Sequence, residues 1–256
     1  MNLNLNSPIN GNYHSGSQIA RVMTESWMSS NIYCPRCGNS YIQHFENNRP
    51  VADFYCPLCG NEYELKSQTG ELGKKVADGA YDTMIERITG NENPDYFFMS
   101  YSRLELTVTD IMIIPKHFFV PDIIEKRKPL SQSARRAGWT GCNILIDRIP
   151  EQGRIPVVSN GEIVDPSTVI QNVGRSMKLA TSSMESRGWL FDVLNCINSI
   201  SDDVFSLADV YRYEQVLQVK HPINHNIRPK IRQQLQFLRD KGFIDFLGNG
   251  KYRKIM

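Results

Sequence analysis

The chain lacks any apolar segment of the length that a membrane span needs. Its apolar runs are short, as at Ile111–Ile114, whereas a transmembrane helix needs about 20 residues. The segment 1–18 is polar and rich in asparagine, without the apolar core of a secretory signal. Internal repeats and low-complexity tracts are absent as well. We therefore expect a cytoplasmic protein of one or two globular domains, with no membrane partner.

The chain also has little net charge. Its 29 basic and 27 acidic side chains give a formal charge of +2, and 41% hydrophobic residues are enough for a sizeable core. The charge is unevenly distributed, because residues 221–256 carry a net +6 and residues 116–136 a net +4. Basic clusters of this kind bind phosphate, although a charged run is more often only solvated. Both segments are candidate nucleic-acid surfaces.

Cysteine is scarce, yet four of the six cysteines form two pairs with the same spacing. Cys34-Pro-Arg-Cys37-Gly and Cys56-Pro-Leu-Cys59-Gly enclose the segment 38–55 between their inner cysteines. This spacing is typical of a structural four-thiolate zinc site with no open coordination position, and Pro and Gly suit its tight turns. The alternative, two disulfides, would require an oxidising compartment. The remaining cysteines are expected to be ordinary buried thiols: Cys142 and Cys196.

An acidic pattern brackets the second cysteine pair. Asp53 lies shortly before Cys56, and Glu64-Leu65-Lys66 shortly after Cys59. Residues 63–68 alternate with period two, so Glu64 and Lys66 share one face of a predicted strand. If the cysteine turn joins this strand to the short run 53–55, Asp53 faces Glu64 on the neighbouring strand.

Two converging carboxylates suit a hard cation such as Mg²⁺. The ion can generate a hydroxide and stabilise charge on a phosphoryl group. Lys66 can orient the water and neutralise developing charge. We therefore expect Asp53, Glu64 and Lys66 to be catalytic; the alternative is that these side chains form only a solvated face.

The first part of the chain has a mixed α/β pattern. Apolar spacing predicts helices near 17–29 and 71–89, and strands near 95–101, 106–114 and 143–147. Residues 150–181 show no clear pattern. We expect 182–188 to be a linker between a first domain, 1–181, and a second domain, 189–256.

The second domain is expected to contain three helices followed by a β-hairpin. The predicted helices cover about 189–199, from a capping box at Ser206 to about Val219, and from near Pro229 to Gly242. Gly248-Asn249-Gly250 then joins two β-prone runs, 243–247 and 252–255. This is the winged-helix arrangement, in which the third helix enters the DNA major groove. Such a module can instead mediate only protein contacts.

Three stretches resemble the DpnI family of methyl-directed type II restriction endonucleases. They are the cysteine and acidic block that ends at Glu64-Leu65-Lys66, the stretch Arg127–Trp139, and the helix entry Asn226–Gln233. The similarity extends over the whole chain. It implies an α/β PD-(D/E)xK nuclease core with an inserted four-cysteine zinc site, followed by a winged-helix domain. It also implies Mg²⁺-dependent hydrolysis of duplex DNA at 5′-GATC-3′ sites that carry N6-methyladenine.

The resemblance also implies roles for individual residues. The Mg²⁺ ligands would be Asp53, Glu64 and the Leu65 carbonyl, and Lys66 would be the catalytic lysine. Ala52 precedes Asp53, so the proline of the family motif is displaced to Pro50.

A reader of N6-methyladenine needs an apolar surface for the methyl group and a polar group for the remaining base edge. Trp139 is the candidate surface, although a tryptophan is often simply part of the core. Gln233 and Gln236 are candidates for adenine edges, or else solvated. With Lys230 and Arg232 they are expected on the outward face of the third helix. The full set of expected DNA contacts is Arg135, Arg136, Trp139, His225, Asn226, Arg228, Lys230, Arg232, Gln233, Gln236, Lys251 and Arg253.

Two other classes of protein fit part of the sequence. A zinc-ribbon and winged-helix transcriptional regulator would not need Asp53, Glu64 and Lys66. A DNA repair nuclease would need them but would not read a short methylated sequence. The favoured hypothesis has duplex DNA with methylated adenine as its partner, Mg²⁺ and Zn²⁺ as its metals, and a monomeric chain.

Overall fold

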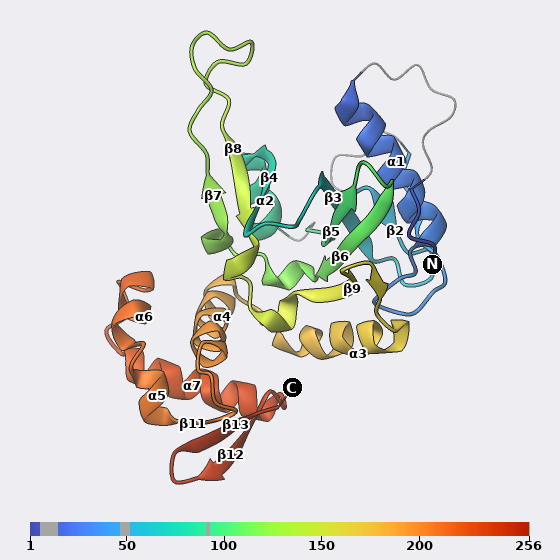
Figure 1. Cartoon of the computed structure of the whole chain (residues 1–256). Coiled ribbons are helices and arrows are strands. Elements are labelled where there is room, and N and C mark those ends of the chain that lie inside the picture. The colour runs from blue at the N-terminus through green and yellow to red at the C-terminus, as the bar shows by residue number, and fades with distance from the viewer. Residues whose placement is uncertain (6–14, 47–51, 91–92, 256) are drawn as a thin grey trace.

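A seven-stranded sheet forms the centre of the computed structural model, which describes residues 1–5, 15–46, 52–90 and 93–255 (Figure 1). Its strand order is β1-β2-β3-β5-β6-β9-β10. The strands are β1 (Gln43–His44), β2 (Phe54–Tyr55), β3 (Glu62–Thr69), β5 (Asp95–Ser102), β6 (Thr107–Ile114), β9 (Ile155–Ser159) and β10 (Glu162–Ile163). Strands β3 and β5 are parallel, and the other neighbours are antiparallel.

Strand β5 is buried on both faces because the sheet is covered on both sides. Its side chains alternate, so Phe97 and Met99 join one hydrophobic cluster while Tyr96 and Phe98 join another. The first cluster includes residues of α1 (Gly16–Asn31) and α3 (Pro166–Ser176). The second includes residues of α2 (Tyr81–Thr89) and α4 (Met184–Asn198). This burial explains the nearly continuous apolar run of β5.

A second, three-stranded sheet lies beside α2, in the order β4-β8-β7. Its strands are β4 (Lys75–Ala80), β7 (Ile124–Lys126) and β8 (Gly141–Leu145). The segment 127–140, here named the basic arm, connects β7 to β8 and extends away from both sheets (Figure 1).

The C-terminal part contains helices followed by a hairpin, as the sequence predicts. Helix α4 is followed by α5 (Leu207–Tyr211), α6 (Glu214–Lys220) and α7 (Ile227–Asp240), and a small sheet has the order β11-β13-β12. Its strands are β11 (Val204–Ser206), β12 (Ile244–Gly248) and β13 (Lys251–Lys254). Asn249 and Gly250, which connect β12 to β13, have positive φ values of 50° and 69°, as a tight hairpin turn requires. The expected fold class, a mixed α/β core followed by a helix-turn-helix unit, is confirmed.

Several predicted elements differ from the structure. The helix expected over 71–89 is wrong in its first half, since β4 occupies part of that range and only α2 is helical. Pairing of β4 with β8 overrides the helix-like spacing of its apolar residues. The helix expected from Ser206 to Val219 is two helices, although its capping box is present. Helix α7 begins at Ile227, which places Pro229 inside its first turn.

The expected linker is largely helical. Helix α4 begins at Met184 because the Ser183 hydroxyl accepts a hydrogen bond from the Ser186 N–H and caps the helix. The helix therefore includes Gly188, although glycine has a low helix propensity. No helix in the described part of the chain is long and apolar enough to cross a membrane.

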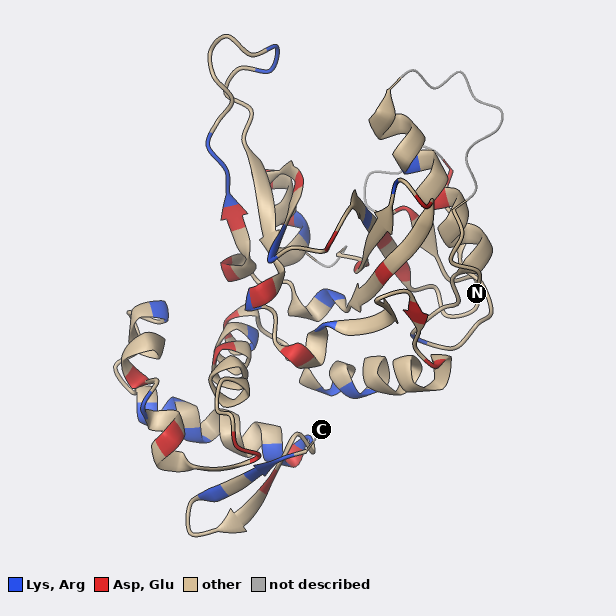
Figure 2. Ribbon diagram, in the orientation of Figure 1, with Lys and Arg blue, Asp and Glu red and all other residues tan. Residues whose placement is uncertain are grey.

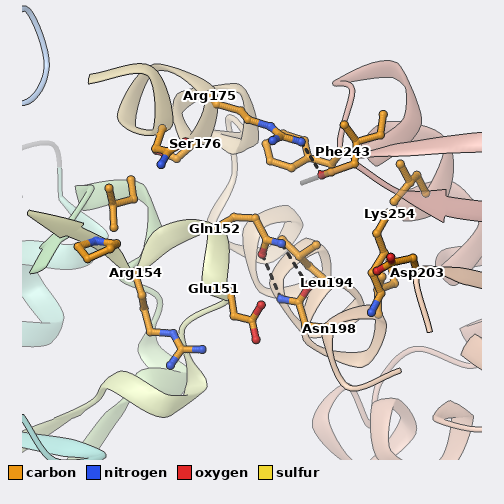
Figure 3. Close-up of a pocket in the computed structure, with 16 residues that line it drawn as sticks. Glu151, Gln152, Arg154, Arg175, Ser176, Leu194, Asn198, Asp203, Phe243 and Lys254 are labelled. Atoms are coloured by element: carbon orange, nitrogen blue, oxygen red, sulfur yellow. Dashed lines mark hydrogen bonds between the residues drawn. The ribbon is translucent and has the colours of Figure 1, made fainter. Parts of the chain in front are cut away.

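Polar contacts hold the C-terminal part against the first part, around a cavity of about 330 Å³ (Figure 3). Gln152 and Asn198 exchange two amide hydrogen bonds of 3.2 and 3.0 Å. The Arg175 guanidinium donates to the Ile255 carbonyl at 2.6 Å and lies 5.0 Å from the Phe243 ring centre. One hydrophobic cluster continues from β5 and α2 into α4 and α7. The helix-turn-helix unit is thus docked on the α/β core.

Candidate active site and metal centre

The four paired cysteines lie together. Their sulfur atoms are all within 4.8 Å of one another, and the sulfurs of Cys34–Cys59 and Cys37–Cys56 are 3.7 and 3.6 Å apart. These distances are much longer than a disulfide bond of about 2.05 Å. They match the edge of about 3.8 Å that a tetrahedron has when its Zn–S bonds are about 2.3 Å. The cluster fits a four-thiolate zinc ion with no position left for substrate.

The two cysteine turns are copies of one local structure. In the first, the Gly38 N–H donates to the Cys34 carbonyl at 2.9 Å; in the second, the Gly60 N–H donates to the Cys56 carbonyl at 2.9 Å. Both glycines have positive φ, 78° and 70°, which glycine adopts without strain. The repeated sequence therefore determines both turns locally.

The second cysteine turn is anchored to the central sheet. Asn61 donates to the buried Asp95 carboxylate at 2.7 Å, and the Tyr63 hydroxyl lies 3.0 Å from the Cys34 sulfur. Asp95 also accepts the Lys116 N–H at 2.7 Å. These contacts fix the end of the turn that leads into β3, directly before Glu64.

That turn makes β2 and β3 antiparallel neighbours, with Phe54 opposite Tyr63. Asp53, directly before β2, donates its N–H to the Tyr63 carbonyl at 2.9 Å. Its carboxylate accepts the Leu65 N–H at 2.8 Å. The structure therefore brings Asp53 beside the Glu64-Leu65-Lys66 segment. Pro50 lies outside the described residues.

Glu64 and Lys66 are tied to each other and to two residues that the sequence did not indicate. The Lys66 ammonium is 2.5 Å from one Glu64 oxygen and also pairs with Asp78 of β4. The other Glu64 oxygen pairs with Arg87 of α2. All four side chains are at most 18% exposed, so water screens these charges only weakly.

Burial and neighbouring charges shift the proton affinities in this site. Burial raises the pKa of Asp53, the Leu65 N–H opposes this rise, and nearby negative charges add to it. Those charges belong to Glu64 and Glu25. Burial lowers the pKa of Lys66, but its two carboxylate partners outweigh burial and hold that pKa above its usual value. The lysine is therefore a stable cation, and its charge partly offsets the effect of the carboxylates on Asp53.

A cleft of about 320 Å³ opens beside Lys66. Its walls come from α1, which provides Arg21 and Glu25, and from β3 and β4. Glu25 pairs with Arg21 at 2.6 Å and with His44 at 3.2 Å. No sequence pattern joins Glu25 to Asp53, because the two approach only when α1 packs on β3.

The donor set beside this cleft fits a hard divalent cation. The Asp53 carboxylate accepts the Leu65 N–H, and the carboxylates of Glu64 and Glu25 are close enough to act on it. Glu64, whose oxygens pair with Lys66 and Arg87, is the second carboxylate of this set. Carboxylate oxygens are the donors that Mg²⁺ prefers.

The basic arm carries several of the candidate DNA contacts. Arg135 and Arg136 are exposed, and Figure 2 shows basic residues near the base and at the tip of the arm. Trp139 is half-buried, so it is neither a core residue nor fully exposed, and the Arg136 guanidinium lies 4.8 Å from its ring centre. The arm thus combines positive charge with a partly exposed aromatic surface.

The helix-turn-helix unit carries the other candidates. All but Lys230 are exposed: His225, Asn226, Arg228, Arg232, Gln233, Gln236, Lys251 and Arg253. Lys230 is less exposed than the outward position predicted for it. This residue is half-buried, with its ammonium 5.9 Å from the ring centre of the buried Trp189. On α7 it lies between the buried Ile227 and Ile231, at the edge of the helix face that packs on α4.

The mixed α/β core, with Glu64 and Lys66 on β3 and Asp53 directly before β2, is followed by a helix-turn-helix unit, which is a module typical of DNA-binding proteins. Comparison with known families is more specific. The chain belongs to the Dam-replacing family (DpnI), whose model matches residues 1–182, and the model of the Dam-replacing helix-turn-helix domain matches residues 185–254. Membership implies a methylation-dependent restriction endonuclease.

Proposed function

We propose that this protein hydrolyses phosphodiester bonds of duplex DNA at 5′-GATC-3′ sites that carry N6-methyladenine, at a PD-(D/E)xK site formed by Asp53, Glu64 and Lys66. The catalytic domain spans 1–181 and the winged-helix domain 189–256. The observation that carries this function is the buried contact set in which Lys66 lies between two carboxylates, next to Asp53. A regulator without catalysis has no need of such a set.

The chain's own groups divide the work of hydrolysis. Asp53, Glu64 and the Leu65 carbonyl are the proposed ligands of Mg²⁺. When bound, the ion activates water and stabilises charge on the phosphoryl group. Lys66, held as a cation, orients the attacking water and neutralises negative charge that develops on the phosphate oxygens. Arg87 compensates the Glu64 charge while that carboxylate is buried away from water.

Recognition is assigned to two surfaces. The exposed residues of α7 enter the major groove, while Lys251 and Arg253 of β13 contact phosphates. The basic arm supplies a second set of phosphate contacts. Trp139, near the C-terminal end of the arm segment, supplies an apolar surface for the methyl group. We expect the two surfaces to act on the same DNA, since the C-terminal part is docked on the α/β core.

Parallel digestion of two plasmids tests this function. The plasmids share one sequence and differ only in N6-methylation of their GATC sites, and both are incubated with the full-length protein and Mg²⁺. We expect cleavage of the methylated plasmid alone, and none by Asp53→Ala. Cleavage of both plasmids would favour a repair or structure-specific nuclease, and cleavage of neither would favour a regulator.

A further inference from the structure

Strand β4 lies between Lys66 and the base of the basic arm. Asp78 of this strand accepts hydrogen bonds from the Lys66 ammonium and, at 2.7 Å, from the Gly79 N–H. Along its edge, β4 pairs with β8, the strand that follows the arm, and Asp78 is opposite Cys142. The same short strand therefore contacts the candidate catalytic lysine and pairs with the strand that directly follows the candidate DNA-reading segment.

Asp78 is well placed to fix the lysine side chain. The Asp78 side chain is 8% exposed and that of Lys66 is 18% exposed, so their attraction is little weakened by water. A lysine side chain is flexible and needs partners to hold its ammonium in one place. Glu64 is a second partner, but it is also a proposed metal ligand. Asp78 is not a proposed metal ligand, so its contact with Lys66 does not compete with an ion.

The direction of Asp78 depends on the base of the arm. The pairing of β4 with β8 is irregular between Asp78 and Ala80, and irregularities of this kind re-aim the side chains beside them. The Tyr81 N–H, directly after β4, donates to the Thr140 carbonyl of the arm at 3.0 Å. The local geometry of β4 is thus held by the last residue of the arm.

Packing at the arm base is tight as well. A Cβ atom on Gly141 would lie 2.8 Å from the Trp139 ring, and 3.5 Å from the Arg127 side chain. Gly141 therefore lets the two ends of the arm close over the start of β8. A movement of Trp139 would be transmitted directly to Gly141, which is opposite Ala80 of β4.

We propose that Asp78 is a positioning residue that holds the Lys66 ammonium and links it to the base of the basic arm, so that DNA contact by the arm affects the cleavage step. This inference rests on the proposed nuclease function. It assigns no contact with substrate to Asp78, which acts through Lys66.

Single-turnover cleavage of a methylated GATC duplex by the full-length protein tests the positioning role. The variants are Asp78→Asn, Lys66→Ala and the control Asp82→Asn, whose side chain is 91% exposed on α2. DNA affinity is measured with Ca²⁺ in place of Mg²⁺. Rates are measured well below the melting temperature of the wild type and of each variant. We expect Asp78→Asn to slow cleavage about 100-fold, the order of effect of a misplaced catalytic group, with unchanged DNA affinity. Asp82→Asn should cleave at the wild-type rate.

The Lys66→Ala variant distinguishes a failure of the proposed nuclease function from a failure of the role proposed for Asp78. A fully active Lys66→Ala would contradict the proposed function. An inactive Lys66→Ala beside a fully active Asp78→Asn would overturn the role of Asp78 alone. Asp78→Glu keeps the charge but displaces it, so its rate should lie between those of Asp78→Asn and the wild type. If Asp78→Asn does not fold, a wild-type rate in Asp78→Glu would overturn the positioning role.

A double-mutant cycle tests the link to the arm. Gly141→Ala pushes on Trp139, and we expect it to slow cleavage about tenfold when Asp78 is present. In the Asp78→Asn background the same substitution should change the rate less than about twofold, because coupled sites are not additive. Equal effects in both backgrounds would show that the arm does not act through Asp78.

Discussion

The two candidate metal sites lie on either side of the turn that joins β2 to β3 in sequence, but they are built in different ways. The cysteine site is made of two local turns with the same spacing, each of which brings its own pair of donors. The acidic site draws charged groups from α1, α2, β3 and β4 and from the residue before β2. A structural metal needs only a closed set of donors. A catalytic site must also balance buried charges, and the partners that do so come from distant segments.

Substitution of a zinc ligand should give the largest effect and separate the two sites. Cys37→Ser should remove the metal and unfold the region around β2, because apparent zinc binding in small zinc domains is worth about 10–16 kcal/mol. Cleavage should be lost too, although no cysteine contacts substrate, since the turn positions Asp53. Metal analysis and thermal melting measure this, with Cys196→Ala as the control that keeps one zinc per chain. A Cys37→Ser variant with wild-type stability would contradict a structural zinc.

Removal of Arg87, one of the two counter-ions of Glu64, should have the next largest effect. Arg87→Gln leaves a buried carboxylate without its guanidinium partner, and we expect a loss of about 3 kcal/mol in the free energy of unfolding. Urea denaturation without divalent metal measures the loss, with the exposed Arg103→Gln as control.

Added metal should partly restore the stability of Arg87→Gln, which would sharpen the comparison between the cysteine site and the acidic site. Addition of Mn²⁺ is expected to stabilise Arg87→Gln more than the wild type, because the ion then supplies the missing positive charge. Equal stabilisation of both proteins would mean that Arg87 and the metal do not share Glu64.

The sequence predicts the cysteine site well and the acidic site only in part. Spacing alone identifies Cys34, Cys37, Cys56 and Cys59, because the turns that hold them are encoded within a few residues. Alternation within β3 correctly predicts that Glu64 and Lys66 lie together. The fold class also follows from local patterns, such as the capping box at the start of α5 and the turn between β12 and β13.

The remaining partners of the acidic site depend on tertiary packing. Asp78 lies in a segment whose apolar spacing suggests a helix, and only pairing with β8 makes it a strand. Arg87 and Glu25 lie on helices whose sequences say nothing about the strand they will cover. Lys230 is half-buried because it lies at the edge of the α7 face that packs against α4. Local spacing contains none of this information.

A buried histidine outside both metal sites should set part of the response to pH. Burial lowers the pKa of His117 to about 4, from an ordinary value of 6.5. Between these values the unfolded chain binds more protons than the folded chain, so stability is lost as the pH falls below 6.5. At about pH 5.5 we expect a loss of about 1 to 2 kcal/mol relative to about pH 8.

Denaturation curves of His117→Gln and of the exposed control His225→Gln measure this contribution. His117→Gln should lose most of the difference between the two pH values, and His225→Gln should keep it. An unchanged pH dependence in His117→Gln would assign the effect to other groups, such as the zinc thiolates.

The smallest expected effect concerns single phosphate contacts. Arg136→Ala in the arm and Arg253→Ala in β13 should each weaken binding to every duplex about two- to fivefold, and reduce the slope of log affinity against log salt by about one. Fluorescence anisotropy at several salt concentrations measures both. A change of the slope in only one variant would mean that a single region holds the DNA backbone.

Asp53, Glu64 and Lys66 are proposed to perform the chemistry while other surfaces bind the DNA. This division of roles is tested most directly by measuring the cleavage rate and DNA affinity of Lys66→Ala on one methylated GATC duplex, with the full-length wild type in parallel. We predict a rate about 100- to 1,000-fold lower, the range expected when a group that stabilises transition-state charge is removed, with affinity within about threefold of wild type. A cleavage rate near that of the wild type would contradict the assignment.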